Sequence, residues 1–313
     1  MSFPAPVVSE WDPSGPFDLA RTLGVLQRGA NDPTVRVSPG EAWLCFQYDG
    51  AACAVRVRHR SAGSPVEFSV WGETAEAAVA ILPALVGAHD DWADFDGDAF
   101  AAPLPHLVRE ARRRNPGVRL PATGRVFDAV VPAILEQKVT GMEARYAWAY
   151  LVNRFGSAAP GPVPRGMKVA PTAAQWRRVP TWEWHQARVD YKRRDAILRS
   201  SHLASGLDRL SQLKNPHEVE AKLRTIPGIG VWTAAEVLQR THGSPDHISV
   251  GDFHLAHFVG QALTGRRTDD AGMLELLQPW AGHRQRVVRM LGLSGAKNPS
   301  YGPRLHAMDH RER

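Results

Sequence analysis

Hydrophobic and polar residues alternate in three segments of the N-terminal third of the chain, which is the pattern of half-buried strands. Two of these segments cover 41–50 and 51–60, and the Asp49-Gly50 dipeptide between them is typical of a tight hairpin turn. The third segment is PVEFSVWG at 65–72. We therefore predict a small antiparallel sheet in this region.

Two segments with helical spacing flank the predicted strands. Apolar residues share one face of 17–29, and the Ala-rich segment 74–87 follows Thr74, a residue type that caps helices. We therefore predict an α+β accessory domain over residues 1–102.

From residue 103 onwards the strand pattern almost disappears, and apolar residues recur with the period of an amphipathic helix. The predicted helices cover 104–114, 125–137, 140–155, 172–178, 182–189, 191–204, 206–212, 216–224, 231–242, 253–263, 270–278 and 282–292. The Pro- and Gly-rich segment 156–172 predicts a loop, because each proline removes a backbone donor. We therefore predict an all-α domain over 103–313, with a flexible end to its basic tail.

Positive charge exceeds negative charge along the chain. The 313 residues include 38 Lys and Arg against 32 Asp and Glu, with a formal charge of +6 and a pI near 9.6. This balance favours contact with a polyanion such as nucleic acid, although an ordinary basic protein can share it. Basic residues cluster at 109–114, 191–199 and 283–289, as solvated helix faces or as phosphate contacts.

The cysteine content and the N-terminus narrow the class of protein. Cys45 and Cys53 are too few for a disulfide framework or for four thiolates around zinc or an iron–sulfur cluster. The N-terminus lacks a basic region followed by an apolar one, and no apolar run approaches the ~18 residues of a membrane-spanning helix. We expect a cytoplasmic protein without membrane contact.

The segment IPGIG at 226–230 joins two predicted helices. The first amides of the second helix have no partner within it, and glycine lets another backbone approach closely. An anion fits such a turn, and on a basic protein without a nucleotide-binding βαβ unit we expect a nucleic-acid phosphate. A plain helical hairpin with glycine as a C-cap is the alternative.

Three segments carry a resemblance to a known family. LRTIPGIGVWTAAEVL (223–238) resembles the helix-hairpin-helix of the DNA glycosylase superfamily, here at about 216–242, and GDFHLAHF (251–258) resembles its aspartate segment. Residues 115–156 resemble the helical segment of AlkA-type 3-methyladenine DNA glycosylases, in which an Ile-Leu-x-Gln turn precedes the DNA wedge. The predicted α+β domain is similar to the accessory domain of these enzymes.

The resemblance implies an activity and a catalytic residue. It implies a monomeric, nucleoid-associated enzyme that flips a damaged, alkylated purine out of double-stranded DNA and hydrolyses its N-glycosyl bond in base excision repair. Cleavage of this bond develops positive charge on the deoxyribose, and a carboxylate held against that charge stabilises it and can deprotonate the attacking water. By resemblance this carboxylate is Asp252. An aspartate at such a position is otherwise a helix N-cap, and Asp252 can serve as both.

Trp232 stands where bifunctional members of the superfamily carry a lysine. Without that amine no Schiff base can form, so the resemblance implies a monofunctional glycosylase that leaves an abasic site. Trp232 lines the base pocket or belongs to the core, and the sequence leaves both open.

Two further motifs match contacts to the extruded strand. Gln137 and Lys138 match the turn that fills the gap left by the flipped nucleotide, although an exposed cation at a helix end is an alternative for Lys138. His254 matches a histidine that contacts phosphate in 8-oxoguanine glycosylases, and we expect His257 to be packed. Without a third ligand nearby, these two histidines do not predict a metal site.

The base pocket is where the sequence departs most from AlkA-type enzymes. Those enzymes place aromatic side chains, which suit cationic alkylated purines, at the positions of Glu236 and Gly292. The departures predict a wider, acidic pocket, unless Glu236 lies on a solvated helix face. Gln285 aligns with a base-reading glutamine of 8-oxoguanine glycosylases. Hypoxanthine and oxidised purines are therefore alternative substrates.

The resemblance also implies contacts made by the backbone of the hairpin. The amides that would hold DNA phosphate belong to Gly228, Gly230 and Thr233. The carbonyls that would hold a monovalent cation belong to Arg224, Ile226 and Ile229. No other cofactor is expected. A non-catalytic module that binds lesion-containing DNA is the alternative from a different class, against which the presence of Asp252 together with Gln137 argues.

Overall fold

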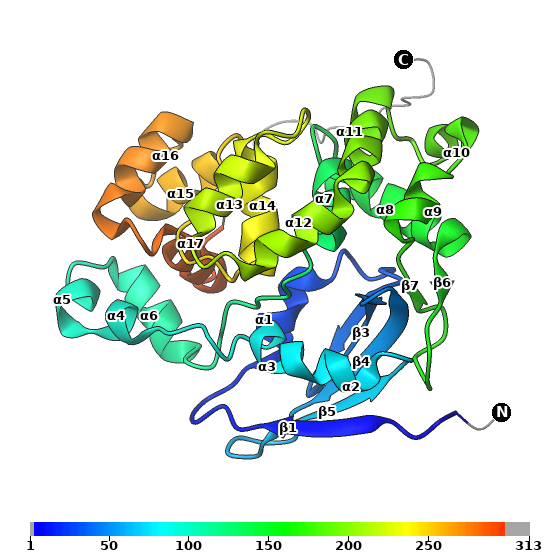
Figure 1. The fold of residues 1–313 in the computed structure, drawn as a ribbon. Helices are drawn as coiled ribbons and strands as arrows, with labels where there is room; N and C mark the ends of the chain where they lie inside the picture. The colour runs from blue at the N-terminus through cyan, green and yellow to red at the C-terminus, as the bar shows by residue number, and fades with distance from the viewer. Residues whose placement is uncertain (1–2, 298–313) are drawn as a thin grey trace.

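The computed structural model describes residues 3–297, so most of the predicted flexible tail lies outside the described residues. An antiparallel sheet with the strand order β1-β5-β4-β3-β2 forms the N-terminal part (Figure 1). Its strands are β1 (Val7–Trp11), β2 (Val35–Ser38), β3 (Glu41–Tyr48), β4 (Ala51–Arg58) and β5 (Val66–Trp71). The predicted hairpin is confirmed, and Asp49 and Gly50 both have positive φ, as its two-residue turn requires. The short edge strands β1 and β2 were not predicted.

Short helices pack on this sheet. They are α1 (Leu19–Leu23), α2 (Ala75–Ala78) and α3 (Leu82–Leu85), with the 3-10 turns η1 (Gly24–Leu26) and η2 (Val79–Ile81). The single helix predicted over 74–87 is wrong, because Pro83 lacks the amide that would continue it and the helix restarts there. Thr74 caps nothing with its side chain; its hydroxyl instead donates to the Tyr48 carbonyl at 3.0 Å.

Helices make up most of the remaining chain. They are α4 (Ala93–Asp96), α5 (Asp98–Ala101), α6 (His106–Arg114), α7 (Val126–Leu135), α8 (Gly141–Phe155), α9 (Ala173–Arg177), α10 (Thr181–Gln186), α11 (Tyr191–His202), α12 (Ala204–Arg209), η3 (Leu210–Gln212), α13 (Pro216–Leu223), α14 (Val231–Thr241), α15 (Leu255–Thr264), α16 (Asp270–Leu277), η4 (Gln278–Trp280) and α17 (Arg284–Leu293). Each helix predicted from residue 104 onwards is present, with shifted ends. The acidic segment before it forms α4 and α5, which were not predicted. No helix within residues 3–297 has the length and apolar content needed to cross a membrane.

The segment 156–172 is more ordered than a plain loop. It contains two short antiparallel strands, β6 (Ser157–Ala158) and β7 (Lys168–Val169). The Lys168 amide donates to the Pro33 carbonyl at 2.7 Å, which attaches β7 to the sheet domain. Strands of two residues are too short for an alternating pattern to indicate them, so the prediction of a loop was incomplete.

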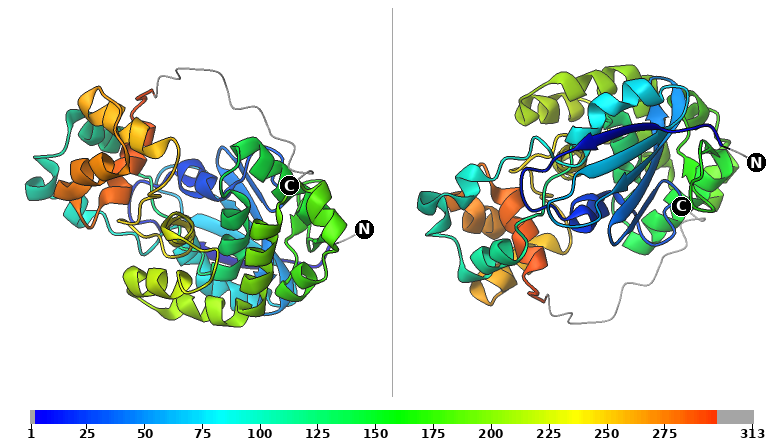
Figure 2. Two further views of the ribbon diagram at one scale, coloured as in Figure 1. Left: turned by 90° about the horizontal axis from the view of Figure 1, so that it is seen from above. Right: turned by 90° about the horizontal axis from the view of Figure 1, so that it is seen from below.

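Two separate hydrophobic cores lie within the helical part. One joins α7, α8, α11 and α14. The other joins Trp92 and Phe95 to α6, α15, α16 and α17, and these elements form a lobe at one end of the molecule (Figures 1 and 2). Trp92 and Phe95 therefore pack with the C-terminal helices, although the predicted domain boundary followed residue 102.

Candidate functional site

The turn between α13 and α14 is held tightly against α11. Gly228 has a φ of +100°, and a Cβ atom there would lie 2.7 Å from the Cβ of Ala196. Nε of Arg199, also on α11, donates to the Pro227 carbonyl at 3.1 Å. Both the backbone conformation and the close packing therefore require glycine at position 228.

Gly230 shows the opposite situation. Its φ of −98° suits any residue, and no heavy atom lies within 4 Å of the place where a Cβ would stand. Gly230 is the N-cap of α14, and no side chain caps this helix. Neither backbone conformation nor packing requires glycine at this position. Its lack of a side chain leaves open space in front of the first amides of α14. Of the three predicted phosphate-binding amides, those of Gly228 and Gly230 belong to exposed residues, whereas Thr233 is buried.

The turn between α7 and α8 is joined to this hairpin by Gln137. Its Nε2 donates to the Gly228 carbonyl and to the Thr233 hydroxyl, both at 2.8 Å. The neighbouring Lys138 is exposed and has a φ of +53°, which is unusual for a residue with a side chain. Gln137 therefore positions the two turns relative to each other, and Lys138 is the residue of the pair whose side chain reaches solvent.

Asp252 lies in the loop that connects α14 to α15. Its Oδ1 accepts from the amides of His254 and Leu255 at 2.8 and 2.9 Å, so Asp252 satisfies the first amides of α15, although the N-cap position itself belongs to His254. Its Oδ2 lies 3.3 Å from Nε1 of Trp232. Trp232 is half-buried and stands beside the aspartate, outside the hydrophobic cores. One carboxylate oxygen of Asp252 thus has an indole N–H as its partner and can meet a ligand.

The residues that follow Asp252 differ in exposure. His254 is exposed, and its ring meets the Phe253 ring edge-on at a centroid distance of 4.9 Å. Nδ1 of His257 lies 2.8 Å from the Thr268 carbonyl, in agreement with the predicted packing role. Phe253 is 70% exposed, which the sequence did not indicate.

Glu236 belongs to a buried network of charges. One of its oxygens accepts from Nη1 of Arg240 at 2.8 Å, and the other accepts from the Ser249 hydroxyl. Arg28, from the sheet domain, pairs with Glu136 close by. Burial raises the pKa of Glu236, but Arg240, the Ser249 hydroxyl and Arg28 outweigh burial and hold the pKa below its ordinary value. The alternative that Glu236 lies on a solvated helix face is therefore wrong, because its side chain is only 13% exposed. Protein groups already occupy both of its oxygens.

Helix α17 carries the remaining predicted pocket residues. The backbone amide of Gln285 donates to the Pro245 carbonyl at 2.9 Å, and its side chain is half-buried. Gly292 is exposed, with no heavy atom within 4 Å of a Cβ position. Gly292 thus leaves open space beside α17 at this position. The role of both residues in reading a base stays a prediction.

Comparisons with known proteins bear on this arrangement. No family model matches the sequence, and no curated protein matches it. Among solved structures, the 3-methyladenine DNA-glycosylase from Archaeoglobus fulgidus matches with a TM-score of 0.72 at 18% identity, over 92% of this chain and 98% of its own. The apo-form of the 8-oxoguanine glycosylase/lyase from Clostridium acetobutylicum matches with a TM-score of 0.68 at 11% identity, over 94% and 100% of the two chains. Its complex with double-stranded DNA containing cytosine opposite 8-oxoguanine gives 0.64 and 13%, over 93% and 98%.

The fold is that of the helix-hairpin-helix DNA glycosylases. The predicted fold class, an α+β N-terminal part followed by helices that include the hairpin, is confirmed in outline.

Two cavities of this glycosylase fold lie away from Asp252. One, of about 60 Å³, lies between sheet and helices, and its lining includes Arg28, Arg125 and Arg240. It suits water rather than a base, since ligand pockets usually measure about 300 Å³ or more. The other, of about 350 Å³, is lined by residues at and around the ends of β1 and β5, and by Pro160. Neither includes Asp252 in its lining.

The backbone carbonyls predicted to hold a cation belong to residues of the turn between α13 and α14. The Ile226 carbonyl accepts from the Ile229 amide at 2.9 Å, which uses one of its two lone pairs. A cation at Arg224, Ile226 and Ile229 stays a prediction.

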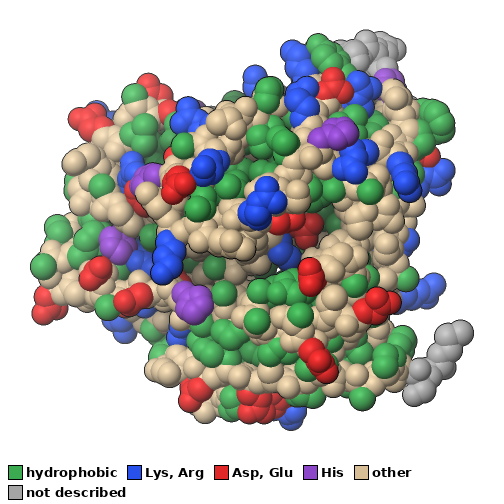
Figure 3. Space-filling model, in the orientation of Figure 1, with side chains coloured by type: hydrophobic (Ala, Val, Ile, Leu, Met, Phe, Trp, Pro, Cys, Tyr) green, Lys and Arg blue, Asp and Glu red, His purple; other side chains and the backbone are tan. Residues whose placement is uncertain are grey.

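Internal ion pairs occupy many of the arginines in the predicted basic runs. Arg113 and Arg114 both pair with Glu110. In another run, Arg286 pairs with the buried Asp90. On the face drawn in Figure 3, Lys and Arg side chains gather over the helices, where Asp and Glu side chains also lie, and over the sheet Asp and Glu outnumber Lys and Arg. Positive charge on this face is therefore concentrated on the part that carries the hairpin.

Proposed function

We propose that this chain is a monofunctional DNA N-glycosylase that removes an alkylated purine from double-stranded DNA and leaves an abasic site. The observation that carries the proposal is the position of Asp252, whose Oδ2 accepts from the indole N–H of Trp232. Gly230, which no neighbouring atom obstructs, is the N-cap of α14, and Trp232 lies in the first turn of the same helix. Solved structures with this fold include a 3-methyladenine DNA-glycosylase and 8-oxoguanine glycosylase/lyases.

Binding begins at the hairpin. A backbone phosphate approaches the first amides of α14 over Gly230, where no side chain obstructs it. Lys138, at the tip of the turn that Gln137 holds against the hairpin, fills the gap left by the extruded nucleotide. These contacts depend on phosphate and shape, so they carry no base specificity.

The reaction is hydrolysis of the bond between the purine and C1′ of the deoxyribose. The bonding electron pair leaves with the base, and positive charge develops on the sugar. Oδ2 of Asp252 stabilises this charge and accepts a proton from the water that attacks C1′. The hydrogen bonds to Oδ1 hold the carboxylate in place during these steps. The products are the free base and an abasic site.

Trp232 supports both the monofunctional reaction and the substrate class. It offers no amine, so no covalent Schiff base forms with the sugar. Its electron-rich ring attracts a cationic alkylated purine through a cation–π interaction. The negative charge of Glu236 is balanced by Arg240, so the indole is the principal attraction for a cationic base.

A panel of duplexes tests this function. Purified protein is incubated with duplexes that contain 7-methylguanine, 3-methyladenine, hypoxanthine or 8-oxoguanine, and alkali then reveals abasic sites. We expect release of an alkylated base, strand cleavage only after alkali, and no borohydride-trapped complex. Release of hypoxanthine or 8-oxoguanine alone would keep the reaction and change the substrate. Tight binding of lesion DNA without release of any base would support a non-catalytic DNA-binding module instead.

The biological setting follows from the reaction. We propose that the protein acts as a monomer on chromosomal DNA in base excision repair, in the cytoplasm at the nucleoid. Sedimentation of the protein with and without a lesion duplex tests the oligomeric state, and a dimer on DNA would contradict it.

A further inference from the structure

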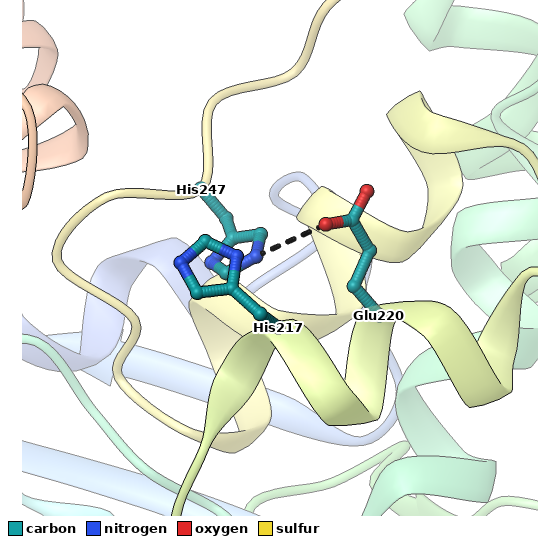
Figure 4. A group of neighbouring side chains, drawn as sticks. All are labelled: His217, Glu220 and His247. Carbon is teal, nitrogen blue, oxygen red and sulfur yellow. Dashed lines mark ion pairs between the residues drawn. The ribbon is translucent and has the colours of Figure 1, made fainter.

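Three potential metal ligands meet at the first helix of the hairpin. His217 and Glu220 lie one turn apart on α13, and His247 lies in the loop between α14 and α15. Their side chains point toward one another (Figure 4), and one ligand atom from each lies within 4.8 Å of the other two. None of the three belongs to the site around Asp252.

The imidazole of His247 is buried and directed into this cluster. The residue is 8% exposed, and its Nδ1 lies 2.6 Å from the Ser244 hydroxyl oxygen. When Nδ1 carries the proton and donates to Ser244, the lone pair of Nε2 faces the cluster. Among residues 3–297, this Nε2 has no hydrogen-bond partner; it faces Oε2 of Glu220, with which it forms an ion pair only when the imidazole is protonated. In the neutral imidazole, the Nε2 lone pair and the carboxylate oxygen face each other with no proton between them, and a metal ion would satisfy both.

The distances suit a zinc ion. Zinc binds imidazole nitrogen and carboxylate oxygen at about 2.0–2.2 Å with tetrahedral angles, so neighbouring ligand atoms lie roughly 3.3–3.5 Å apart. Nε2 of His247 lies 3.4 Å from Oε2 of Glu220. The other oxygen of Glu220 faces Nη1 of Arg224, also at 3.4 Å, so Oε2 is the one directed at His247. His217 is exposed, and one of its ring nitrogens lies within 4.8 Å of a ligand atom of each of the other two residues.

We propose that His217, Glu220 and His247 bind a zinc ion, with water completing the tetrahedron. Two imidazoles and one carboxylate are a donor set that zinc favours and magnesium does not. The Ser244 hydroxyl fixes the His247 tautomer, as supporting residues do for histidine ligands of zinc. This site does not depend on the proposed glycosylase activity.

The ion would connect two parts of the hairpin region. Glu220 and His217 belong to α13, and His247 belongs to the loop that continues to Asp252. Nε2 of Gln239 on α14 also donates to the His247 carbonyl at 3.0 Å. A zinc ion would therefore join α13 to a loop already attached to α14, and stabilise the position of that loop.

Zinc binding by protein without an affinity tag tests the proposal. Calorimetry and metal analysis after dialysis should give about one zinc per chain for the wild type, and a raised melting temperature with zinc but not with magnesium. His217→Ala changes an exposed residue and should melt like the wild type without metal. We expect it to bind zinc at least about tenfold more weakly and to lose the zinc-dependent rise in melting temperature. Glu220→Gln should behave in the same way.

His202→Gln is the matched control, because His202 is an exposed histidine on α11, outside the cluster. It should bind zinc like the wild type. Equal zinc affinity in the wild type, His217→Ala and Glu220→Gln would overturn the proposal. An equal loss of affinity in His202→Gln would overturn it as well, because zinc would then be bound by surface histidines in general.

Discussion

Two carboxylates lie along the contact between α14 and the loop that leads to α15, and their surroundings differ. Asp252 uses one oxygen to cap α15 and leaves the other with the Trp232 indole. Glu236, one turn after Trp232 on α14, has both oxygens engaged by Arg240 and Ser249. Whether an acidic residue near a site can take part in catalysis therefore depends on the partners of each of its carboxylate oxygens. Asp252 can take part in chemistry, whereas Glu236 stabilises the fold.

The largest expected effect concerns Asp252. Asp252→Asn should lower the rate of base release by about a thousandfold, because the amide cannot balance the charge on the sugar or accept a proton from water. Its stability should match that of the wild type, since the amide oxygen still accepts from both capped amides. Single-turnover kinetics and thermal unfolding measure the two effects. Asp269→Asn, which changes the N-cap of α16, is the control and should leave base release unchanged.

Glu236→Gln should show the reverse pattern, with a loss of stability and little loss of activity in the folded enzyme. Removing one partner of a mostly buried ion pair lowers the free energy of unfolding by about 3 kcal/mol. Urea unfolding measures this change. Glu218→Gln disrupts a half-exposed pair with Lys222 and should cost no more than about 0.5 kcal/mol. A Glu236 variant as stable as this control would show that the buried network contributes nothing.

The stabilisation that Glu236 contributes depends on pH in a defined direction. The pKa of Glu236 is held below its ordinary value in the folded protein, so its stabilisation is present above the unfolded pKa of about 4.3. It is lost as the pH falls through the lower folded pKa. The difference in stability between wild type and Glu236→Gln should therefore be complete near neutral pH and shrink in acid. A difference that grows in acid would contradict this assignment.

The two hairpin glycines should separate stability from DNA binding. Gly228→Ala should lower the free energy of unfolding by about 2 kcal/mol, because alanine at this φ is strained and its Cβ meets Ala196. Gly230→Ala should change stability by less than about 1 kcal/mol, yet weaken duplex binding by about tenfold, because the methyl group obstructs the approach to α14. Fluorescence anisotropy and urea unfolding measure both. Equal duplex binding by wild type and Gly230→Ala would show that no DNA phosphate binds at the first amides of α14.

The smallest effect is expected at Lys138. Lys138→Gly relieves a positive φ and should raise the free energy of unfolding by about 1 kcal/mol, while base release falls by a few-fold because nothing fills the gap in the duplex. Ser14→Gly relieves a similar φ of 53° far along the sequence and should leave base release unchanged. If both variants release base at the wild-type rate, Lys138 does not act on DNA.

Local periodicity predicted much of this fold. The helices from residue 104 onwards and the β3–β4 hairpin follow from apolar spacing and the Asp49-Gly50 turn. Elements of two to five residues, such as β1 and β6, were missed because so few positions carry no readable pattern. Thr74 shows another limit, since its hydroxyl donates to the distant Tyr48 instead of capping the next helix.

The site was only partly predictable for a related reason. The hairpin glycines and Asp252 stand close together in the sequence, and their spacing indicated them. The partners of Glu236 come from distant segments, and the sheet residue Arg28 adds to its surroundings. His247 likewise meets α13 through the folded loop. Such contacts depend on tertiary packing, which no local pattern contains.

The most direct test of Asp252 as the catalytic residue is the structure of Asp252→Asn bound to a duplex that contains the lesion that the wild type removes. We expect an extruded nucleotide whose C1′ lies within about 4 Å of the side chain at position 252, with a phosphate on the amides at the start of α14. A nucleotide that remains stacked in the duplex, or that is extruded to a place away from residue 252, would contradict the assignment of Asp252 as the catalytic residue.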